Sequence, residues 1–407
     1  MVEQNSGSGS NPLLYTGLLP QEEMLEIGKK QKKLLIGIPH EDQEYEKRIG
    51  LTPEAVEVLV NNGHDVLIHK HAGNGALYPR TDYSEHGAFI VEENDKIWNA
   101  DIIIKVSPLT LDEANKLKGN QIVFSALNVN QQSSEYIKAL MKKKITAISF
   151  EHIKNEFNTY PVLQSMNAIS GSTAVIIAAE LLSNISGGKG VLLGGVTGIT
   201  PTEVVILGAG TAAESATRAA LGFGALVKVF DTSVQKLEEL QRNIGIRLHT
   251  SIFHPQVFSR ALQSADVLIG AVELMGQGPR FFVTEDMVRL MKKGAVLLDL
   301  VVDQGGCIET SECRNLKNPQ FIKHDVVHYC VSNMPSRVAR TASIALSNIL
   351  SPILLQMGSI GGLKPLLIEN KGLRNGVYLY NGILTSERIG SAFGMPYKDI
   401  DLLMAAF

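Results

Sequence analysis

Short apolar runs alternate with amphipathic segments along most of the chain. The runs "KLLIGI", "ADIIIKV", "NQIVFSAL" and "ITAISF" are rich in β-branched residues, and helical patterns stand between them. These runs are apolar at successive positions rather than at every second position, which is typical of strands buried on both faces. The pattern therefore predicts a parallel sheet covered by helices on both sides.

A second series of such runs follows a glycine-rich link. A long helical pattern from 162 to 182 leads into "SGGKGVLLGGVTGITP", and the strand-like runs "VVILG", "LVKVFD", "ADVLIGA" and "GAVLLDLVV" come after it. The sequence therefore predicts an α/β fold with two Rossmann-like, doubly wound domains. We expect an N-terminal extension over 1–32, one domain formed by 33–160 together with 340–407, and another formed by 161–339.

The two ends of the first domain carry further expectations. In "LTPEAVEVLVNNGHDVLIH", Thr52 can cap a helix and Pro53 suits its first turn, so helix, turn and strand should follow one another. A helical segment from about 338 to 357 is expected to pack back on this domain. The residues from 375 onward show little regular pattern, and we predict that they form a loop.

Composition excludes several classes of function. Of 407 residues, 44% are hydrophobic and 19% are charged, and the net charge is -3, so no basic field is offered to nucleic acid or to an acidic membrane. The three cysteines lack the spacing of metal ligands, and we expect no metal. The apolar runs are shorter than the roughly 20 residues that span a bilayer, and the chain opens on a polar segment. We expect a cytoplasmic protein without a membrane partner.

The stretch "VVILGAGTAAESATR" carries the strongest motif. Gly208, Gly210 and Ala213 form G-x-G-x-x-A between a strand and a helix, where glycines allow a tight turn and close approach to a pyrophosphate. The helix N-terminus then presents free N–H groups to the phosphates. Asp231 ends the next strand and suits the adenine-ribose hydroxyls, which favours NAD over NADP. The alternative is a strand–helix turn that uses glycine for shape alone.

Several longer stretches resemble the alanine dehydrogenase and nicotinamide nucleotide transhydrogenase family. They are "GIPHEDQEYEKRIGLTPEAV", "GGKGVLLGGVTGITPTEVVILGAGTA", "LVVDQGGCIETSE" and "HYCVSNMPSRVARTAS". The resemblance covers about 34–395 and is stronger toward alanine dehydrogenase. It implies hydride transfer in which L-alanine, NAD⁺ and water give pyruvate, ammonium and NADH. It also implies a homohexamer with the active site in a cleft between the two domains.

The resemblance also implies roles for individual residues. Arg48 in "EKRIGLTP" matches the arginine that holds the substrate carboxylate, and Asp303 in "VVDQGGC" matches an aspartate near the substrate amine. Asn333 and Met334 match residues that contact the nicotinamide, and Asn167 replaces a serine that contacts the cofactor. Without the resemblance, Arg48 reads as a surface arginine and Asp303 as a turn cap. Lys236, near the ribose-binding acid, reads either as an adenosine contact or as part of a solvated helix face.

Two positions depart from the family. Where alanine dehydrogenases have "K-V-K-E-P", this chain has "KVSP", so either the second lysine has become Ser107 or Lys105 serves in its place. We favour Lys105, because a lysine after three isoleucines is costly to bury. Asn128 stands where the family has its proposed general base, a histidine. An amide accepts hydrogen bonds but no proton at neutral pH, so proton transfer would fall to Asp303.

Three functions remain open at this point. The first is an amino-acid dehydrogenase that takes a small amino acid or 2-oxo acid, the second a transhydrogenase-like nucleotide-binding protein, and the third a non-catalytic NAD-binding relative. Among the remaining candidates, His328 lies in a strand-like run and reads as a core histidine. His69 and His71 end a strand, and no chemistry is assigned to them.

Overall fold

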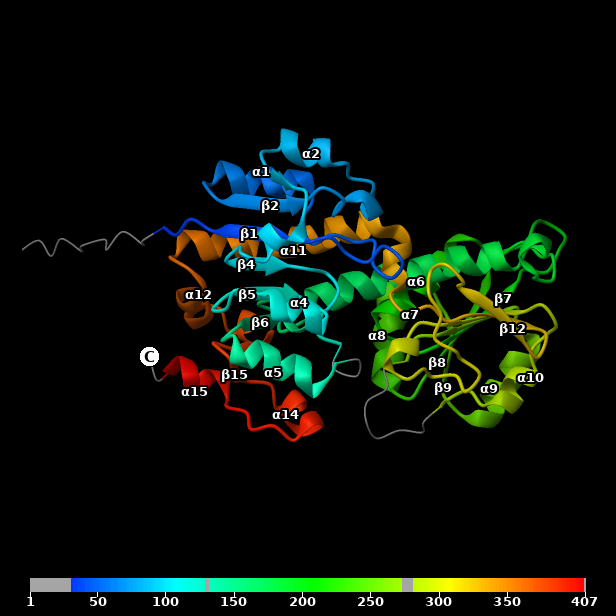
Figure 1. Ribbon diagram of the computed structural model, residues 1–407. Coiled ribbons are helices and arrows are strands. Elements are labelled where there is room, and N and C mark those ends of the chain that lie inside the picture. Colours follow the sequence, from blue (N-terminus) through cyan, green and yellow to red (C-terminus); the bar gives the residue numbers. More distant parts are fainter. Residues whose placement is uncertain (1–30, 129–131, 273–280, 406–407) are drawn as a thin grey trace, which may run out of the picture.

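The computed structural model describes residues 31–128, 132–272 and 281–405, which form two α/β domains joined by a long helix (Figure 1). Each domain is built on a mostly parallel sheet with helices on its faces, as the sequence pattern predicts. The helix α6 (Pro161–Leu181) runs from the first domain into the second. Its first turns pack in the core of the first domain, and its later turns pack in that of the second.

The first sheet has the strand order β15-β14-β6-β5-β4-β1-β2-β3 within the described residues. Strands β1 to β6 pair in parallel, whereas β14 is antiparallel to both β6 and β15. The bounds are β1 Leu35–Ile38, β2 Asp65–His69, β3 Phe89–Val91, β4 Ile102–Ile104, β5 Ile122–Ser125, β6 Thr146–Ser149, β14 Val377–Tyr380 and β15 Ile383–Leu384.

Helices of this domain come from both ends of the chain. They are α1 Pro53–Asn61, α2 Arg80–Glu85, α3 Asn94–Ile97, α4 Leu111–Lys116, α5 Ser134–Lys142, α11 Ala339–Ser359, α12 Leu363–Glu369, α13 Lys371–Arg374, α14 Glu387–Phe393 and α15 Ile400–Ala405. The N-cap of α1 is Thr52, whose hydroxyl accepts the Ala55 N–H, and Pro53 occupies the first turn, as expected. Apolar side chains of α11 pack in the same core as those of β1, so the late helix returns to the first domain.

The second sheet has the order β12-β13-β11-β10-β7-β8-β9. All neighbours pair in parallel except β12 and β13. The strands are β7 Glu203–Leu207, β8 Leu226–Asp231, β9 His249–Ile252, β10 Val267–Gly270, β11 Val296–Asp299, β12 Gln320–Lys323 and β13 Val326–Tyr329, and the helices are α7 Thr211–Gly222, α8 Val234–Ile244, α9 Pro255–Ser264 and α10 Glu285–Arg289. The strand β7, which lies between β10 and β8, ends in the glycine turn, and this places the turn at the carboxyl edge of the sheet.

The prediction of a loop from 375 onward is wrong. This segment contributes β14 and β15 to the first sheet and forms α14 and α15. Every residue of β14 is buried, and the phenol of Tyr378 lies 3.3 Å from that of Tyr136 on α5. The strands are too short for a periodic signal, and their pairing with β6 is a long-range contact that local pattern does not reveal.

Two helices are long enough to cross a bilayer, although the apolar runs in the sequence are shorter than that length. By length and composition, α6 and the segment Met334–Ser359 could each cross a membrane. In each, 44% of the residues in the most apolar window are buried inside the protein. Both contribute to its hydrophobic cores and pack against each other, which is the behaviour of core helices in a two-domain protein.

Candidate functional site

Arg48 lies where the two domains meet and forms a two-pronged ion pair with Glu46. Its Nε donates to Oε1 of Glu46 at 2.8 Å, and its Nη2 donates to Oε2 at 2.7 Å. The side chains are only 12% and 4% exposed. Burial disfavours the charge of Arg48, but Glu46 outweighs burial, and the pKa of the guanidinium is raised. Arg48 is therefore a buried, charged group and not a surface arginine.

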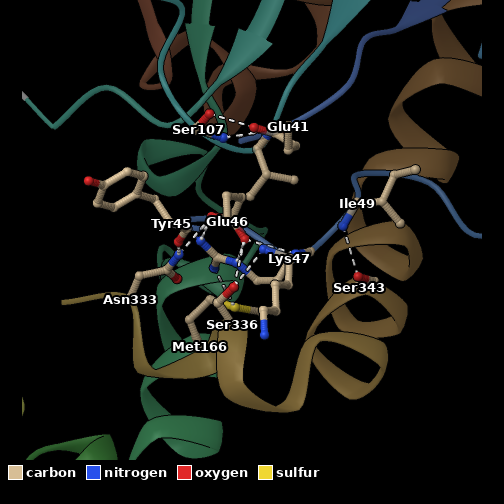
Figure 2. A network of polar contacts seen from close by, with 12 residues as sticks. Glu41, Tyr45, Glu46, Lys47, Ile49, Ser107, Met166, Asn333, Ser336 and Ser343 are labelled. Atoms are coloured by element: carbon tan, nitrogen blue, oxygen red, sulfur yellow. Dashed lines mark hydrogen bonds and ion pairs between the residues drawn. The ribbon is translucent and has the colours of Figure 1, made fainter. Parts of the chain in front are cut away.

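The second domain contacts this ion pair through Asn333. Its Nδ2 donates to Oε2 of Glu46 at 2.8 Å and to the carbonyl of Tyr45 at 3.0 Å. Both partners are pure acceptors, which fixes the orientation of the amide. The hydroxyl of Ser336 accepts the Lys47 N–H at 2.7 Å and donates to Oε1 of Glu46 at 3.3 Å. Figure 2 shows Glu46 among these groups, so one carboxylate links both domains.

Glu41 is a second buried carboxylate beside this cluster. It accepts hydrogen bonds from the N–H groups of Val106 and Ser107 and from the Ser107 hydroxyl (Figure 2). Burial raises the pKa of Glu41 to about 7, while the Lys105 ammonium opposes the rise and Glu46 adds to it. Ser107, one of the two candidates for the place of the family lysine, is thus bonded to an acid of the site.

Lys105 is directed toward α4 instead. It is 5% exposed, and its Nζ donates to Glu113 at 2.8 Å and to the carbonyl of Pro108 at 3.3 Å. Glu113 also accepts the N–H of Thr110, with which it forms the capping box of α4. The lysine reaches the cluster through its charge, because it acts on the pKa of Glu41. Direct contact between Lys105 and a substrate stays a prediction.

Asp303 lies in the turn that follows β11, at the carboxyl edge of the second sheet, where ligands of parallel sheets bind. The turn is organised by Asp299, which accepts hydrogen bonds from the Val301 N–H at 3.1 Å and the Ser311 hydroxyl at 2.7 Å. Burial raises the pKa of Asp303, and the carboxylates of Glu151 and Asp299 raise it further. Asp303 therefore holds a proton more readily than an ordinary aspartate does.

Asn128 follows β5 in the left-handed conformation, with φ of 36°. The N–H of the preceding residue, Leu127, donates to Oε2 of Glu151 at 3.2 Å. Glu151 comes just after the neighbouring strand β6, and its charge acts on the pKa values of both Arg48 and Asp303. A carboxylate thus lies beside the position where the family has its histidine.

The glycine turn has the form that a dinucleotide requires. Gly208 has φ of 114°, and a Cβ there would lie 2.5 Å from the carbonyl oxygen of Ala271. Gly210 is the N-cap of α7, and a Cβ there would meet nothing within 4 Å among the described residues. No side chain of the described chain caps this helix, so its first N–H groups can face an anion. Ala213 is fully buried where α7 packs on the sheet.

Asp231 ends β8 beside this turn. It is 4% exposed, and its carboxylate accepts the N–H groups of Ala209 at 2.7 Å and Ser233 at 2.8 Å. The acid therefore braces the glycine turn, and each oxygen keeps a second lone pair. Lys236 lies in the first turn of α8, and its backbone N–H donates to the hydroxyl of Ser233. The ribose contact of Asp231 and the adenosine contact of Lys236 stay predictions.

Asn333 also offers an acceptor toward the cofactor. Its Nδ2 is occupied, but its buried Oδ1 has no hydrogen-bond partner among the described residues. Such an orphan is costly unless a donor from a ligand meets it, and the carboxamide of nicotinamide is one such donor. Met334 is buried at the start of the short helix Met334–Val338, which packs against α6. Asn167 lies half-buried on α6 next to Met166. These residues fit a nicotinamide, and their contacts with it stay predictions.

Four histidines of the described chain lie in two different settings. His328 is fully buried, with Nε2 2.8 Å from the Thr310 hydroxyl and Nδ1 2.9 Å from the carbonyl of Val326, which confirms a satisfied core histidine. His69 and His71 group with His40, with ring centroids 5.2 to 6.1 Å apart. No set of three potential ligands in the part of the chain that the structure describes is arranged to hold a metal.

Sequence reasoning missed the carboxylates of the site, namely Glu41, Glu46 and Glu151. Glu46 could have been found, because an arginine that must be buried needs a counter-charge close by. Glu151 could have been found by the argument that found Asp303, because it too follows the end of a parallel strand. Glu41 shows no such signal, since its burial depends on contacts with a segment 65 and 66 residues away.

Comparison with known families finds a match to two domain descriptions. The description "Alanine dehydrogenase/PNT, N-terminal domain" matches residues 37–170, and "Alanine dehydrogenase/PNT, C-terminal domain" matches residues 174–387. The chain is 38% identical over 369 residues to an alanine dehydrogenase of Staphylococcus saprophyticus, which covers 90% of this chain and 99% of the relative. It is 36% identical to alanine dehydrogenase 2 of Staphylococcus aureus, covering 90% of this chain and 98% of the relative.

Solved structures agree with these matches. An L-alanine dehydrogenase superimposes with a TM-score of 0.82 at 34% identity, covering 88% of this chain and 99% of the other. A transhydrogenase from Sinorhizobium meliloti superimposes with a TM-score of 0.72 at 23% identity, covering 87% and 99%. The second likeness concerns the fold alone. The first confirms two Rossmann-like domains.

Proposed function

This chain belongs to the alanine dehydrogenase and PNT family, and from that premise we propose that it is an NAD-dependent dehydrogenase that converts L-alanine reversibly to pyruvate and ammonium. The observation that carries the proposal is the polar network of Glu46. It holds Arg48 of the first domain against Asn333 of the second. A group that binds carboxylates and a group that fits a nicotinamide thus meet at one point between the domains.

Arg48 is arranged to receive the carboxylate of an amino acid. Glu46 takes the edge of the guanidinium formed by Nε and Nη2, so the edge formed by Nη1 and Nη2 remains for a second carboxylate. Nη1 now lies 3.3 Å from the sulfur of Met166, which is a weak acceptor. A substrate carboxylate can replace this contact with a stronger, charge-assisted one.

The nucleotide would be held by the second domain. The N–H groups at the start of α7 would face its phosphates, Asp231 its ribose, and Oδ1 of Asn333 its carboxamide. When bound, NAD⁺ accepts the hydride from the substrate carbon. An acid at position 231 disfavours the 2′-phosphate of NADP⁺ through like charge and desolvation, so selectivity for NAD follows.

The remaining chemistry consists of proton transfers. Loss of hydride leaves an imino acid, water adds to its carbon, and the resulting carbinolamine releases ammonia as its hydroxyl loses a proton. Asp303 lies at the edge of the nucleotide domain, and its raised pKa makes it a better proton acceptor than an ordinary aspartate. Asn128 cannot act as the base, because its amide takes up no proton at neutral pH.

We also propose a homohexamer that works in the cytoplasm. Support for assembly comes from the link between α6 and β7, where Leu192, Val196 and Ile199 are exposed. Exposed apolar side chains gathered in one segment are common at subunit contacts. The number six rests on the family resemblance, and the cytoplasmic location rests on the three sparse cysteines, which suit a reducing compartment.

The proposal is tested by measuring NADH formation against a panel of L-amino acids, and NADH consumption with 2-oxo acids and ammonium. L-alanine and pyruvate should be the preferred pair. Transfer of hydride between nucleotides without any amino acid would favour a transhydrogenase-like protein. Binding of NAD⁺ without turnover of any substrate would favour the non-catalytic alternative, for which Asn128 is the motive.

A further inference from the structure

The proton that leaves the attacking water has no acceptor at position 128, but another side chain lies beside the backbone of the preceding residue. Strands β5 and β6 are parallel neighbours, with Ser125 paired to Ser149, so the segments that follow them leave the sheet side by side. Asn128 follows the first strand and Glu151 follows the second. The Leu127 N–H donates to Oε2 of Glu151, which ties the carboxylate to the backbone directly before Asn128.

The carboxylate of Glu151 is held by one of its two oxygens. Oε2 accepts the Leu127 N–H at 3.2 Å and the Ser149 hydroxyl at 3.4 Å. These bonds fix the side chain in place and leave Oε1 as the oxygen that can meet a reactant. Glu151 is half-buried, so solvent reaches the group only in part.

Glu151 faces both halves of the site. Its negative charge supports the raised pKa of Arg48, which would hold the substrate carboxylate. It also contributes, after burial, to the raised pKa of Asp303 on the other domain. The charge of Glu151 thus reaches both the group that would hold the substrate and an acid of the nucleotide domain.

We propose that Glu151 is a catalytic residue of this enzyme and takes the proton from the water that attacks the imine, in place of the absent histidine. This inference rests on the proposed dehydrogenase function. Glu151 of the first domain would take the proton of the attacking water, and Asp303 of the second domain would take the hydroxyl proton of the carbinolamine.

Loss of hydride from the amine leaves a protonated imine. Oε1 of Glu151 takes a proton from water, the water oxygen bonds to the imine carbon, and the C=N electron pair moves to nitrogen, which becomes a neutral amine. Protonated Glu151 then gives that proton to the amine of the carbinolamine. The C–N bond breaks, the hydroxyl proton passes to Asp303, and its O–H electron pair forms the carbonyl. Ammonia leaves, and the proton on Asp303 returns to it or to solvent.

The test is Glu151→Gln, because glutamine keeps an oxygen that can accept the Leu127 N–H but takes up no proton. A positioned general base contributes about 10² to 10⁴ in rate. We expect kcat with L-alanine to fall by at least about 10²-fold, KM to change little, and the acidic limb of the pH–rate profile to disappear. NADH binding followed by fluorescence should match the wild type, which shows that the variant folds.

A sharper test is whether a second substitution restores the activity that Glu151→Gln loses. Adding Asn128→His to Glu151→Gln places a base at the family position, and the double variant should recover at least about tenfold in kcat over the single one. Glu156→Gln is the matched control, because it makes the same substitution at an exposed glutamate five residues further along the chain. Its kcat should equal that of the wild type.

Each outcome separates the two proposals. An active wild type with unchanged kcat and pH profile in Glu151→Gln overturns the role of Glu151 and leaves the dehydrogenase standing. A loss of kcat that Asn128→His does not restore, with the acidic limb still present, also overturns it. A wild type that turns over no amino acid overturns the proposed function and this inference with it.

Discussion

Replacing Glu41 with glutamine should change how stability depends on pH. Glu41 is 3% exposed, and the hydrogen bonds described above fasten it to the Val106–Ser107 turn. Burial is the main cause that raises its pKa from 4.5 to about 7. Glutamine has nearly the same shape as the protonated acid and never ionises, so the substitution removes the titration and little else.

The sign and size follow from linkage. Between about pH 4.5 and about pH 7 the folded chain keeps a proton on Glu41 that the unfolded chain has released, so the free energy of unfolding falls as pH rises. The slope is about 1.4 kcal/mol per pH unit, and the whole interval amounts to about 3 kcal/mol. This contribution is fully present below the unfolded pKa and is lost as pH rises through the folded one.

The assay is unfolding by urea at a series of values between about pH 4 and pH 8 for the wild type and Glu41→Gln. As pH rises across this range, the free energy of unfolding of the variant should increase by about 3 kcal/mol relative to that of the wild type. Glu156→Gln, which changes an exposed carboxyl group, is the control and should show no such gain. A difference between the wild type and Glu41→Gln that stays flat with pH would refute the reasoning.

Three further predictions concern binding and assembly. Asp231→Ala should weaken NAD⁺ by about tenfold to a hundredfold, the value of a charged hydrogen bond, and should narrow the gap to NADP⁺; calorimetry that finds NADP⁺ bound equally tightly by the wild type would contradict this. Arg48→Lys should lose the two-pronged grip, so that kcat/KM for L-alanine falls by about tenfold to a hundredfold, measured from initial rates; an unchanged value would remove Arg48 from the substrate site. Light scattering at micromolar concentration should report a mass near six chains, and a monomer would argue against the hexamer.

The fold was predictable where local pattern and motif coincide. The run before Gly208 is both apolar and followed by the nucleotide motif, and β7, the turn and α7 appear where expected. Thr52 and Pro53 likewise stand just before an amphipathic segment, and α1 begins there. The strands and helices from 375 onward were not predicted. A two-residue strand such as β15 forms because it pairs with β14, and its own residues show no strand pattern.

The site was predictable only in part. Position in a motif made Arg48 and Asp303 candidates for the site, but which carboxylates surround them depends on how the two domains meet. Glu46 is bonded by Asn333, which lies 287 residues away in the sequence. No local pattern reports such a contact. The ion pair between Lys105 and Glu113 of α4 was likewise not foreseen.

The central claim is that this site couples oxidation of L-alanine to reduction of NAD⁺ through acids of both domains. The most direct measurement follows NADH, pyruvate and ammonium together, with the wild type and with Asp303→Asn. The account predicts the three products in equal amounts from the wild type, and no turnover by the variant despite NAD⁺ binding that calorimetry finds nearly unchanged. NADH that appears without pyruvate, or an Asp303→Asn variant as fast as the wild type, would contradict it.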